Sequence, residues 1–346
     1  MSKQFVAVLS VIPLIFLGQI VSACANTNNE ALQVYCFLNE LEKQPVSRDI
    51  AAKIDKKLKS QGYKNGLALG FKDPAEAINI SVSSSINFDD NLNGGNPRGP
   101  LRLGGLTFQT DPDLERKSGV LIGGQVNLEH RKPISEGKYI TLHASVSRLH
   151  NAEHDMAVGS RYGEICSINH IKNWWYLNAC GVKSHQEKKL NSNNSSQYSL
   201  STSKIFGGND QNYSAVTAGL NNLRTEEFTQ NQLRFGYENL NPNGRNFSLN
   251  VTFGKPVKNA LTLQNSVEIS YTTIIRKKPL KINFKTTNYS GSKLLGYGRS
   301  DIANSINLSL PLTKSLVLTA GATETNSSID YYDSLTPVFG LQYNPS

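Results

Sequence analysis

The stretch GVLIGGQVNLE, residues 119–129, alternates between two kinds of side chain. An apolar set and a mostly polar set interleave: Val120, Ile122, Val126 and Leu128 against Leu121, Gln125, Asn127 and Glu129. Because successive side chains of a β-strand point to opposite faces, such a strand has one apolar and one polar face. Segments of about ten residues with this pattern, separated by turn residues, are typical of transmembrane β-barrels.

The same alternation recurs to the end of the chain, for example in FSLNVTFG (residues 247–254) and LTLQNSVEISY (residues 261–271). We therefore predict an all-β fold, a transmembrane antiparallel β-barrel of about 14 strands, an even number as in bacterial single-chain barrels. The predicted strands are 78–88, 119–132, 138–149, 156–168, 174–185, 197–206, 213–223, 231–240, 246–255, 261–274, 280–289, 301–311, 315–324 and 335–344.

The barrel prediction assigns places to charged and aromatic residues. Charged side chains would face a hydrated lumen: Glu129, Glu268, Lys281 and Lys285. Aromatic side chains would face the two membrane interfaces: Trp175, Phe253, Tyr271 and Tyr343. Connections after even-numbered strands are short, and most after odd-numbered strands are expected to be longer, notably 89–118. This asymmetry would put both ends of the barrel domain in the periplasm.

The N-terminus reads as a secretory signal peptide, residues 1–23. Lys3 supplies the positive start, residues 5–20 are mostly apolar, and Val21, Ser22 and Ala23 precede a cleavage point. No other apolar run is long enough for a spanning helix. A membrane barrel and a soluble secreted β-protein remain, and the mean hydropathy of −0.37 is compatible with a barrel.

The net charge and the cysteines indicate which binding partners and which disulfide to expect. The net charge of +9 falls by one when Lys3 leaves, and the basic residues are scattered, so we do not expect nucleic acid as a partner. A basic lumen, or loops near anionic lipopolysaccharide, fits better. Export permits disulfides, and the symmetric placement of Cys166 and Cys180 about Asn173 predicts a bond across a hairpin.

Cys24 has two interpretations. It could pair with Cys36, or Val21-Ser22-Ala23-Cys24 could be a lipobox that makes Cys24 a lipid-modified first residue and leaves Cys36 unpaired. Residues 24–66 form a periplasmic helical segment in our prediction. Leu32, Tyr35, Leu38 and Leu41 mark one amphipathic helix, and Ile50, Ile54 and Leu58 mark a second that ends near Gly62 and Gly66. This hairpin could be an appendage, a plug in the barrel, or a remnant of a larger helical domain.

Residues that could support chemistry occur in two loops. Asp89, Asp90, Asn91 and Asn93 could suggest calcium but lack the spacing and terminal Glu of an EF-hand loop. His150, Glu153, His154 and Asp155 could activate water, yet no carboxylate pair across the barrel mouth is identifiable. There is no Gly-x-Ser-x-Gly elbow, phosphate-binding loop or paired Cys-x-x-Cys motif. We therefore expect no catalytic residues, no metal and no cofactor.

Two segments resemble a known family. Ile78 to Gly95 runs as a strand into the turn Asp89-Asp90-Asn91-Leu-Asn93-Gly94-Gly95, and Lys117-Ser118-Gly119 leads into a strand that reaches Pro133-Ile134-Ser135. Both are similar to the surface lipoprotein assembly modifiers, and the resemblance covers roughly residues 70–346. It implies a C-terminal barrel of about 14 strands and a role in moving specific proteins across the outer membrane. Those proteins carry a helical-repeat domain where this chain has one hairpin.

These observations lead to one functional hypothesis and its rivals. Residues 67–346 would form a bacterial outer-membrane barrel that assists translocation or surface display of a partner protein or lipoprotein. Its partners would be outer-membrane lipids and an exported client. The alternatives are a general porin or small-solute channel, an outer-membrane lipid or peptide hydrolase, and a soluble secreted β-protein.

Overall fold

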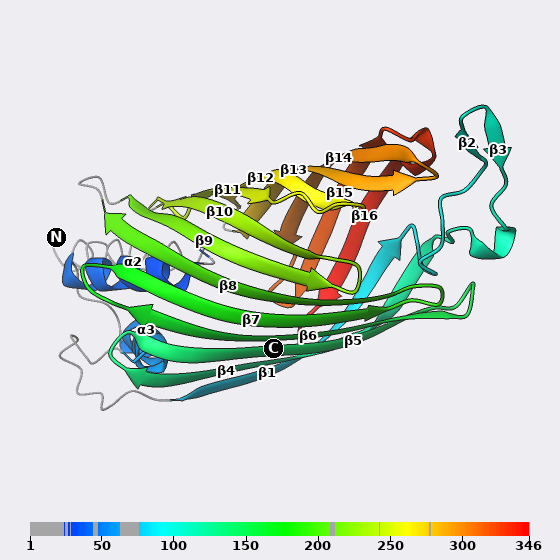
Figure 1. Ribbon diagram of the computed structural model, residues 1–346. Coiled ribbons are helices and arrows are strands. Elements are labelled where there is room, and N and C mark those ends of the chain that lie inside the picture. The colour runs from blue at the N-terminus through cyan, green and yellow to red at the C-terminus, as the bar shows by residue number, and fades with distance from the viewer. Residues whose placement is uncertain are drawn as a thin grey trace.

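The fold is a closed antiparallel barrel with two helices at one end (Figure 1). The computed structural model describes residues 24, 27, 29–43, 48–62, 76–207, 212–241, 243–276 and 278–345, with the backbone alone for 40–43 and 48–53. Each barrel strand pairs with its sequence neighbour in the barrel, and β1 closes the barrel against β16. The prediction of fourteen barrel strands is confirmed.

The strand bounds follow the alternating segments of the sequence. The barrel strands are β1 Ala77–Asp89, β4 Gly119–Ser135, β5 Lys138–Asn151, β6 Met156–His170, β7 Trp175–Glu187, β8 Ser192–Gly207, β9 Tyr213–Thr225, β10 Thr229–Leu240, β11 Asn246–Gly254, β12 Thr262–Ile275, β13 Lys278–Leu294, β14 Tyr297–Pro311, β15 Leu316–Ser327 and β16 Ser334–Tyr343. A small hairpin, β2 Leu101–Leu103 and β3 Leu106–Phe108, and two short helices, η1 Pro112–Leu114 and η2 Asp330–Tyr332, lie in the connections.

The outer surface of the barrel is apolar. Ile78, Ile122 and Leu220 expose 66%, 60% and 61% of their surface, and the alternation places all three outward. Burying such side chains in lipid is favourable, whereas a soluble protein rarely leaves so continuous an apolar surface in water. The chain is therefore a membrane-spanning β-barrel. The aromatic residues Trp175, Phe253, Tyr271 and Tyr343 are also exposed on this face.

The predicted lumen charges face inward. Glu268 lies directly opposite Lys285 on β13, and Glu268 and Lys281 line the main cavity. In a closed barrel all backbone groups can pair between strands, and the polar side chains of alternate positions meet water inside. No helix among the described residues has both the length and the apolar character needed to cross a bilayer.

The loop asymmetry was predicted wrongly in part. Most connections after odd-numbered strands are short, since β7 ends at Glu187 and β8 begins at Ser192, and β13 and β14 are separated by two residues. Cross-strand pairing continues beyond the apolar alternation, because a strand that extends past the lipid needs no apolar face. Residues 90–118 remain a long connection, as predicted, and contain a small two-stranded hairpin.

The two helices lie inside the end of the barrel. α2 spans Glu30–Lys43 and α3 spans Arg48–Ser60. α2 contacts β8 and β9, and α3 contacts β4. Of the three interpretations offered by the sequence, the structure therefore supports the plug. The predicted signal peptide, residues 1–23, and Gly66 lie outside the described residues.

Candidate functional site: the lumen and its two ends

The helical end of the lumen is closed by an apolar contact. Leu32, Val34 and Phe37 of α2 and Ile54 and Leu58 of α3 are buried in one cluster with inward-facing residues of the barrel wall. The wall residues are Tyr176, Ile205, Tyr213, Ala215 and Leu240. We call residues 24–62 the plug. Burial of Val34 and Phe37 beside Leu32 shows that α2 is covered on more than the single face that the sequence predicted.

Aromatic rings and one glycine allow close contact between the plug and the barrel wall. Tyr35 lies edge-on to Trp174 and Tyr213, with ring centroids 4.6 Å and 5.8 Å apart. Gly62 ends α3 with φ of +79°, and a Cβ there would lie 2.1 Å from the carbonyl oxygen of Ser135. A side chain at Gly62 would therefore collide with the turn between β4 and β5, and the prediction that Gly62 ends this helix is confirmed.

A buried ion pair joins the plug to β4. Arg131 contacts the Glu30 carboxylate of α2 and also lies 3.0 Å from Glu129. The Arg131 side chain is only 6% exposed. Tyr139 donates a 2.9 Å hydrogen bond to Glu30 Oε2, and Arg131 Nη1 donates to Ser60 Oγ at 3.3 Å. A buried charge that loses its partner is strongly destabilising, so this pair fixes where the plug sits.

Other contacts of the plug are also polar. Thr27 donates a hydrogen bond to Glu238 of β10, which also accepts a 2.7 Å hydrogen bond from Asn246. A disulfide joins Cys24 to Cys36 and ties the start of the plug to α2. A lipid-modified Cys24 would have no sulfur free for this bond. Among the described residues, the plug contacts named here lie on or beside strands β4, β5 and β7–β10, on one side of the barrel.

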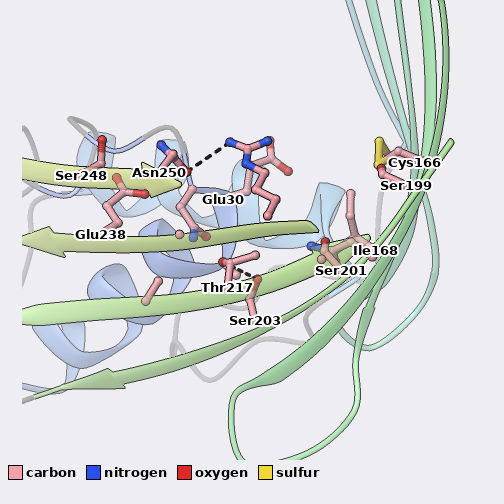
Figure 2. Close-up of a pocket in the computed structure, with 18 of the residues that line it drawn as sticks. Glu30, Cys166, Ile168, Ser199, Ser201, Ser203, Thr217, Glu238, Ser248 and Asn250 are labelled. Carbon is pink, nitrogen blue, oxygen red and sulfur yellow. Dashed lines mark hydrogen bonds between the residues drawn. A yellow bond between two sulfur atoms is a disulfide. The ribbon is translucent and has the colours of Figure 1, made fainter. Parts of the chain in front are cut away.

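A polar cavity of about 670 Å³ adjoins the plug (Figure 2). Figure 2 shows Glu30 of the plug facing a wall of hydroxyl and amide side chains. Ser203 and Thr217 share a 2.9 Å hydrogen bond, and Arg234 donates to Asn250 at 3.2 Å. The lining includes both acidic and basic side chains: Glu30, Glu164, Glu238, Glu268, Arg234 and Lys281. Such a lining suits water and small polar solutes better than an apolar ligand.

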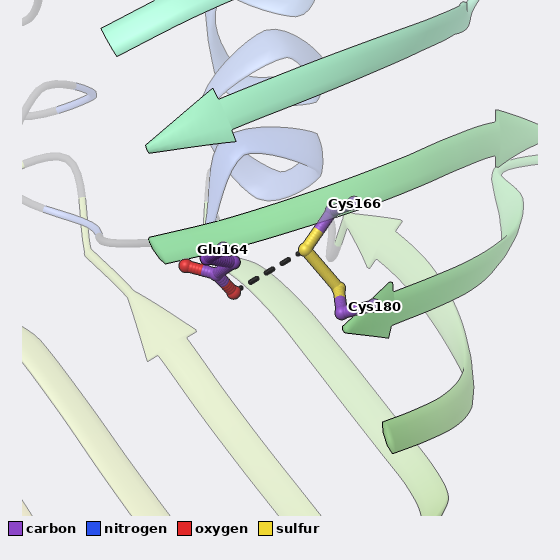
Figure 3. A group of neighbouring side chains, drawn as sticks. All are labelled: Glu164, Cys166 and Cys180. Atoms are coloured by element: carbon purple, nitrogen blue, oxygen red, sulfur yellow. Dashed lines mark hydrogen bonds between the residues drawn. A yellow bond between two sulfur atoms is a disulfide. The ribbon is translucent and has the colours of Figure 1, made fainter. Parts of the chain in front are cut away.

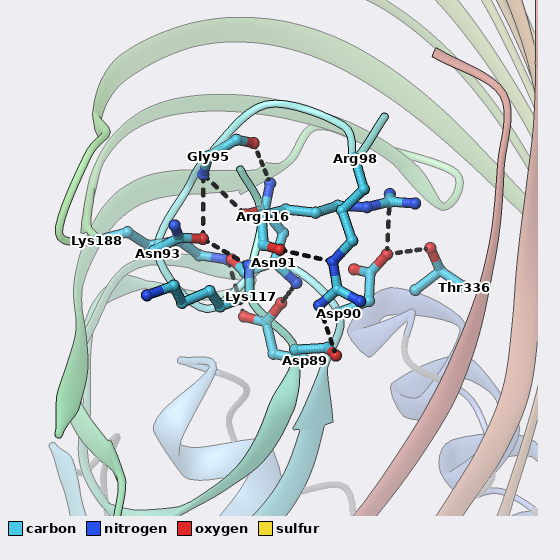
Figure 4. A network of polar contacts seen from close by, with 11 residues as sticks. Asp89, Asp90, Asn91, Asn93, Gly95, Arg98, Arg116, Lys117, Lys188 and Thr336 are labelled. Carbon is cyan, nitrogen blue, oxygen red and sulfur yellow. Dashed lines mark hydrogen bonds and ion pairs between the residues drawn. The ribbon is translucent and has the colours of Figure 1, made fainter. Parts of the chain in front are cut away.

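The opposite end of the lumen carries the turn of residues 89–95, which we call the mouth turn (Figure 4). Asp89 Oδ1 accepts from Asn91 N at 2.8 Å, and Asn91 Oδ1 accepts from Gly95 N at 2.9 Å. Asn93 is 1% exposed; it donates to Glu115 O at 2.8 Å and accepts from Lys117 N at 2.9 Å. These short polar side chains replace the backbone partners that a turn lacks.

Charged residues attach the mouth turn to other strands. Lys188, between β7 and β8, lies 2.8 Å from Asp89 Oδ2 and 2.6 Å from the carbonyl oxygen of Asn91. Asp90 lies 3.5 Å from Arg116 and accepts a 2.7 Å hydrogen bond from Thr336 of β16. Both carboxylates are therefore engaged by protein donors, which favours the interpretation of a structural turn over that of a calcium loop.

The two predicted disulfide partners Cys166 and Cys180 are joined in the lumen wall. They are directly opposite each other on β6 and β7. Glu164 Oε1 lies 3.3 Å from Cys166 Sγ (Figure 3). These three side chains could hold a metal only if both cysteines were free thiolates, because a disulfide sulfur carries no negative charge. The oxidised pair is thus a cross-link of the wall.

The histidine–carboxylate cluster does not form a compact site. His150 Nε2 lies 3.8 Å from Asp155, and the two side chains are 52% and 97% exposed. Glu153 is exposed as well. The arrangement is that of a solvated turn between β5 and β6. The sequence reasoning gave no role to Arg131, Glu30 or Lys188, and only their charge in a barrel interior could have drawn attention to them.

Comparisons with known proteins show no family for this chain. Searches of protein families and of curated proteins found no match. Among solved structures, OccAB4 of Acinetobacter baumannii is 9% identical with a TM-score of 0.39 and covers 78% of this chain and 98% of that one. A BenF-like porin of Pseudomonas fluorescens is 6% identical with a TM-score of 0.40, over 77% and 98%. OccK2 of Pseudomonas aeruginosa is 9% identical with a TM-score of 0.41, over 77% and 97%. Likenesses this low carry no argument about function.

Proposed function

We propose that the protein is a bacterial outer-membrane channel for small polar solutes, with the helical plug as its gate on the periplasmic side. The observation that carries this proposal is the setting of the plug. It sits in a polar lumen and is fixed there by one apolar cluster and by the Glu30–Arg131 pair. Weakening either contact would widen the passage without disturbing the strand pairing. No covalent chemistry is needed.

Single-channel recording in planar bilayers tests the proposal. Arg131→Gln removes the cation that faces Glu30, and we expect a larger or more frequent open level than in the unmodified protein. Lys132→Gln is the matched control, because Lys132 is next in sequence, exposed and on the outer face. The proposal fails if neither the unmodified protein nor Arg131→Gln conducts, or if the two conduct identically.

A second candidate function is the assistance of protein export or surface display, and the seam between β1 and β16 favours it. β1 pairs with β16 over four residues, Ser84 to Asn87, but with β4 over thirteen. Residues 77–83 of β1 have no β16 partner in this register. Backbone groups in lipid need a partner, and an incoming strand of a client could supply it.

Locking the seam distinguishes the two functions. Ser84 and Tyr343 are directly opposite, so Ser84→Cys with Tyr343→Cys would form a cross-strand disulfide. If the protein assists export, the oxidised variant should trap a surface protein in the periplasm, as deletion of the whole chain would, while conductance is unchanged. If neither deletion nor locking traps any surface protein, the export function is wrong.

A further inference from the structure

The outer face of the barrel carries a row of basic side chains near the mouth. Arg148, Arg161, Lys183 and Arg224 are all exposed. Each shares its strand face with an outward apolar residue: Val146 with Arg148, Ile165 with Arg161, Leu177 with Lys183 and Leu220 with Arg224, which are 56%, 55%, 39% and 61% exposed. The alternation therefore directs these four cations toward the membrane and not into the lumen.

The strand register brings the four side chains together. Arg161 of β6 lies opposite Val146, two residues from Arg148 on the same face of β5. On its other side Arg161 lies opposite His185, two residues from Lys183 on β7. Lys183 and Arg224 flank Ser196 of β8 from either side. The pairs Arg148/Arg161 and Arg161/Lys183 are diagonal neighbours, which lie about 7–8 Å apart. Lys183 and Arg224 are two strands apart, about 10 Å. These spacings allow the four cations to bind two adjacent anionic groups.

In the described part of the chain, some basic residues have a carboxylate partner, and the four cations of the row do not. Arg116, Arg131, Lys188 and Arg299 each contact a carboxylate. Among the residues described, no ion pair is found for Arg148, Arg161, Lys183 or Arg224. Arg224 instead donates to Asn222 at 2.8 Å and lies 5.5 Å from the Tyr198 ring centroid. Two acidic side chains lie near the row: Glu187 is opposite Gly159 in the register, and Glu226 accepts a hydrogen bond from Asn194 of β8. Neither forms an ion pair among the described contacts.

The position of the row along the membrane normal indicates which groups compensate its positive charge. Toward the middle of the barrel the same face is apolar, with Leu200 and Ile165 exposed, and the outward ring of Tyr198 lies beside the row. A cation on the lipid face is costly at the bilayer midplane and tolerated near the interface, where headgroups lie. Several unpaired like charges at that level repel each other unless headgroup anions lie between them.

We propose that Arg148, Arg161, Lys183 and Arg224 form a binding site for the phosphate groups of a phosphorylated glycolipid of the outer leaflet, whose acyl chains lie along Val146, Ile165 and Leu200. Arginine suits this role because its planar guanidinium donates two parallel hydrogen bonds to phosphate oxygens. The site is independent of whether the lumen conducts solutes or serves export.

Lipid retention by the purified full-length chain tests the site. Native mass spectrometry would follow binding of bisphosphorylated lipid A and of the same lipid without phosphates. We expect the phosphorylated lipid to be retained, and Arg148→Gln/Arg161→Gln/Lys183→Gln to weaken retention at least tenfold. Inorganic phosphate at the same concentration should not displace it, because phosphate lacks the acyl chains.

Matched variants keep the test decisive. Lys132→Gln/Lys138→Gln changes two exposed outer-face cations at the other end of β4 and β5 and should retain the lipid. If the triple variant does not fold, judged by heat-modifiable mobility, the single change Arg161→Gln replaces it, with an expected loss of several-fold. Equal retention of the dephosphorylated lipid, or unchanged retention by the folded variant, would overturn the proposal.

Discussion

The segments at the two ends of this lumen are held in place by different means. The plug is a separate segment that docks through apolar side chains and one buried ion pair. The mouth turn is a continuation of β1 that is held by amide side chains and by the ion pair of Lys188 with Asp89, whose side chains are 16% and 24% exposed. Apolar burial is strong but non-directional, whereas the hydrogen bonds of the mouth turn fix one geometry. The plug is therefore suited to come out as a unit, and the mouth turn to stay in place.

The largest effect should come from truncating side chains in the apolar cluster that holds the plug. Leu32 and Phe37 are 0% and 7% exposed, and truncating such side chains costs about 2–5 kcal/mol each. Leu32→Ala/Phe37→Ala should therefore release the plug while the barrel stays folded. Faster protease cleavage within residues 29–62, with unchanged heat-modifiable mobility, would show this. A plug that remains protected would mean that the ion pair alone holds it.

Removing one disulfide should affect only the plug, and removing the other should affect only the barrel wall. They close loops of 12 and 14 residues in sequence separation, each worth about 3 kcal/mol in the chain-entropy description. Cys24→Ser/Cys36→Ser should raise plug cleavage, and Cys166→Ser/Cys180→Ser should lower the unfolding midpoint of the barrel in urea. If both double variants change plug cleavage and the unfolding midpoint of the barrel alike, the plug and the wall are not stabilised independently. Mass spectrometry of the mature N-terminus would also decide whether Cys24 carries lipid.

The mouth turn should respond less strongly. Asn93→Ala removes the acceptor for Lys117 N and the donor to Glu115 O, and leaving buried backbone groups unpaired costs about 1–3 kcal/mol. We expect faster amide exchange across residues 89–118 and unchanged protection of the plug. Ser195→Ala, which alters another side-chain hydrogen bond near this end, is the control. Equal loosening of both ends would show that they are coupled.

The smallest effect concerns Lys57 of α3. Burial lowers its pKa below the ordinary 10.5, Glu30 opposes that shift, and Arg131 adds to it. The charged form is thus disfavoured in the docked plug. That penalty is complete below the lowered pKa and vanishes above 10.5. Plug cleavage should slow as the pH rises toward 10, and Lys57→Met should show slow cleavage at every pH. Faster cleavage at high pH would contradict this sign.

The sequence by itself determined the barrel. Strand alternation is a local property with a period of two, so segments such as 119–129 state which side chains meet lipid and which meet water. The spacing of Cys166 and Cys180 about a single turn predicted their pairing for the same reason. Loop lengths were less readable, because polar residues beyond the lipid can pair or turn with equal ease.

Only the tertiary structure decided the place of the helices, the short seam and the basic row on the outer face. Glu30 and Arg131 are 101 residues apart, and nothing local marks them as partners. Contacts of this kind depend on how the closed sheet brings distant strands around the same interior. Register between neighbouring strands likewise fixes which cations adjoin, and a sequence read segment by segment does not contain it.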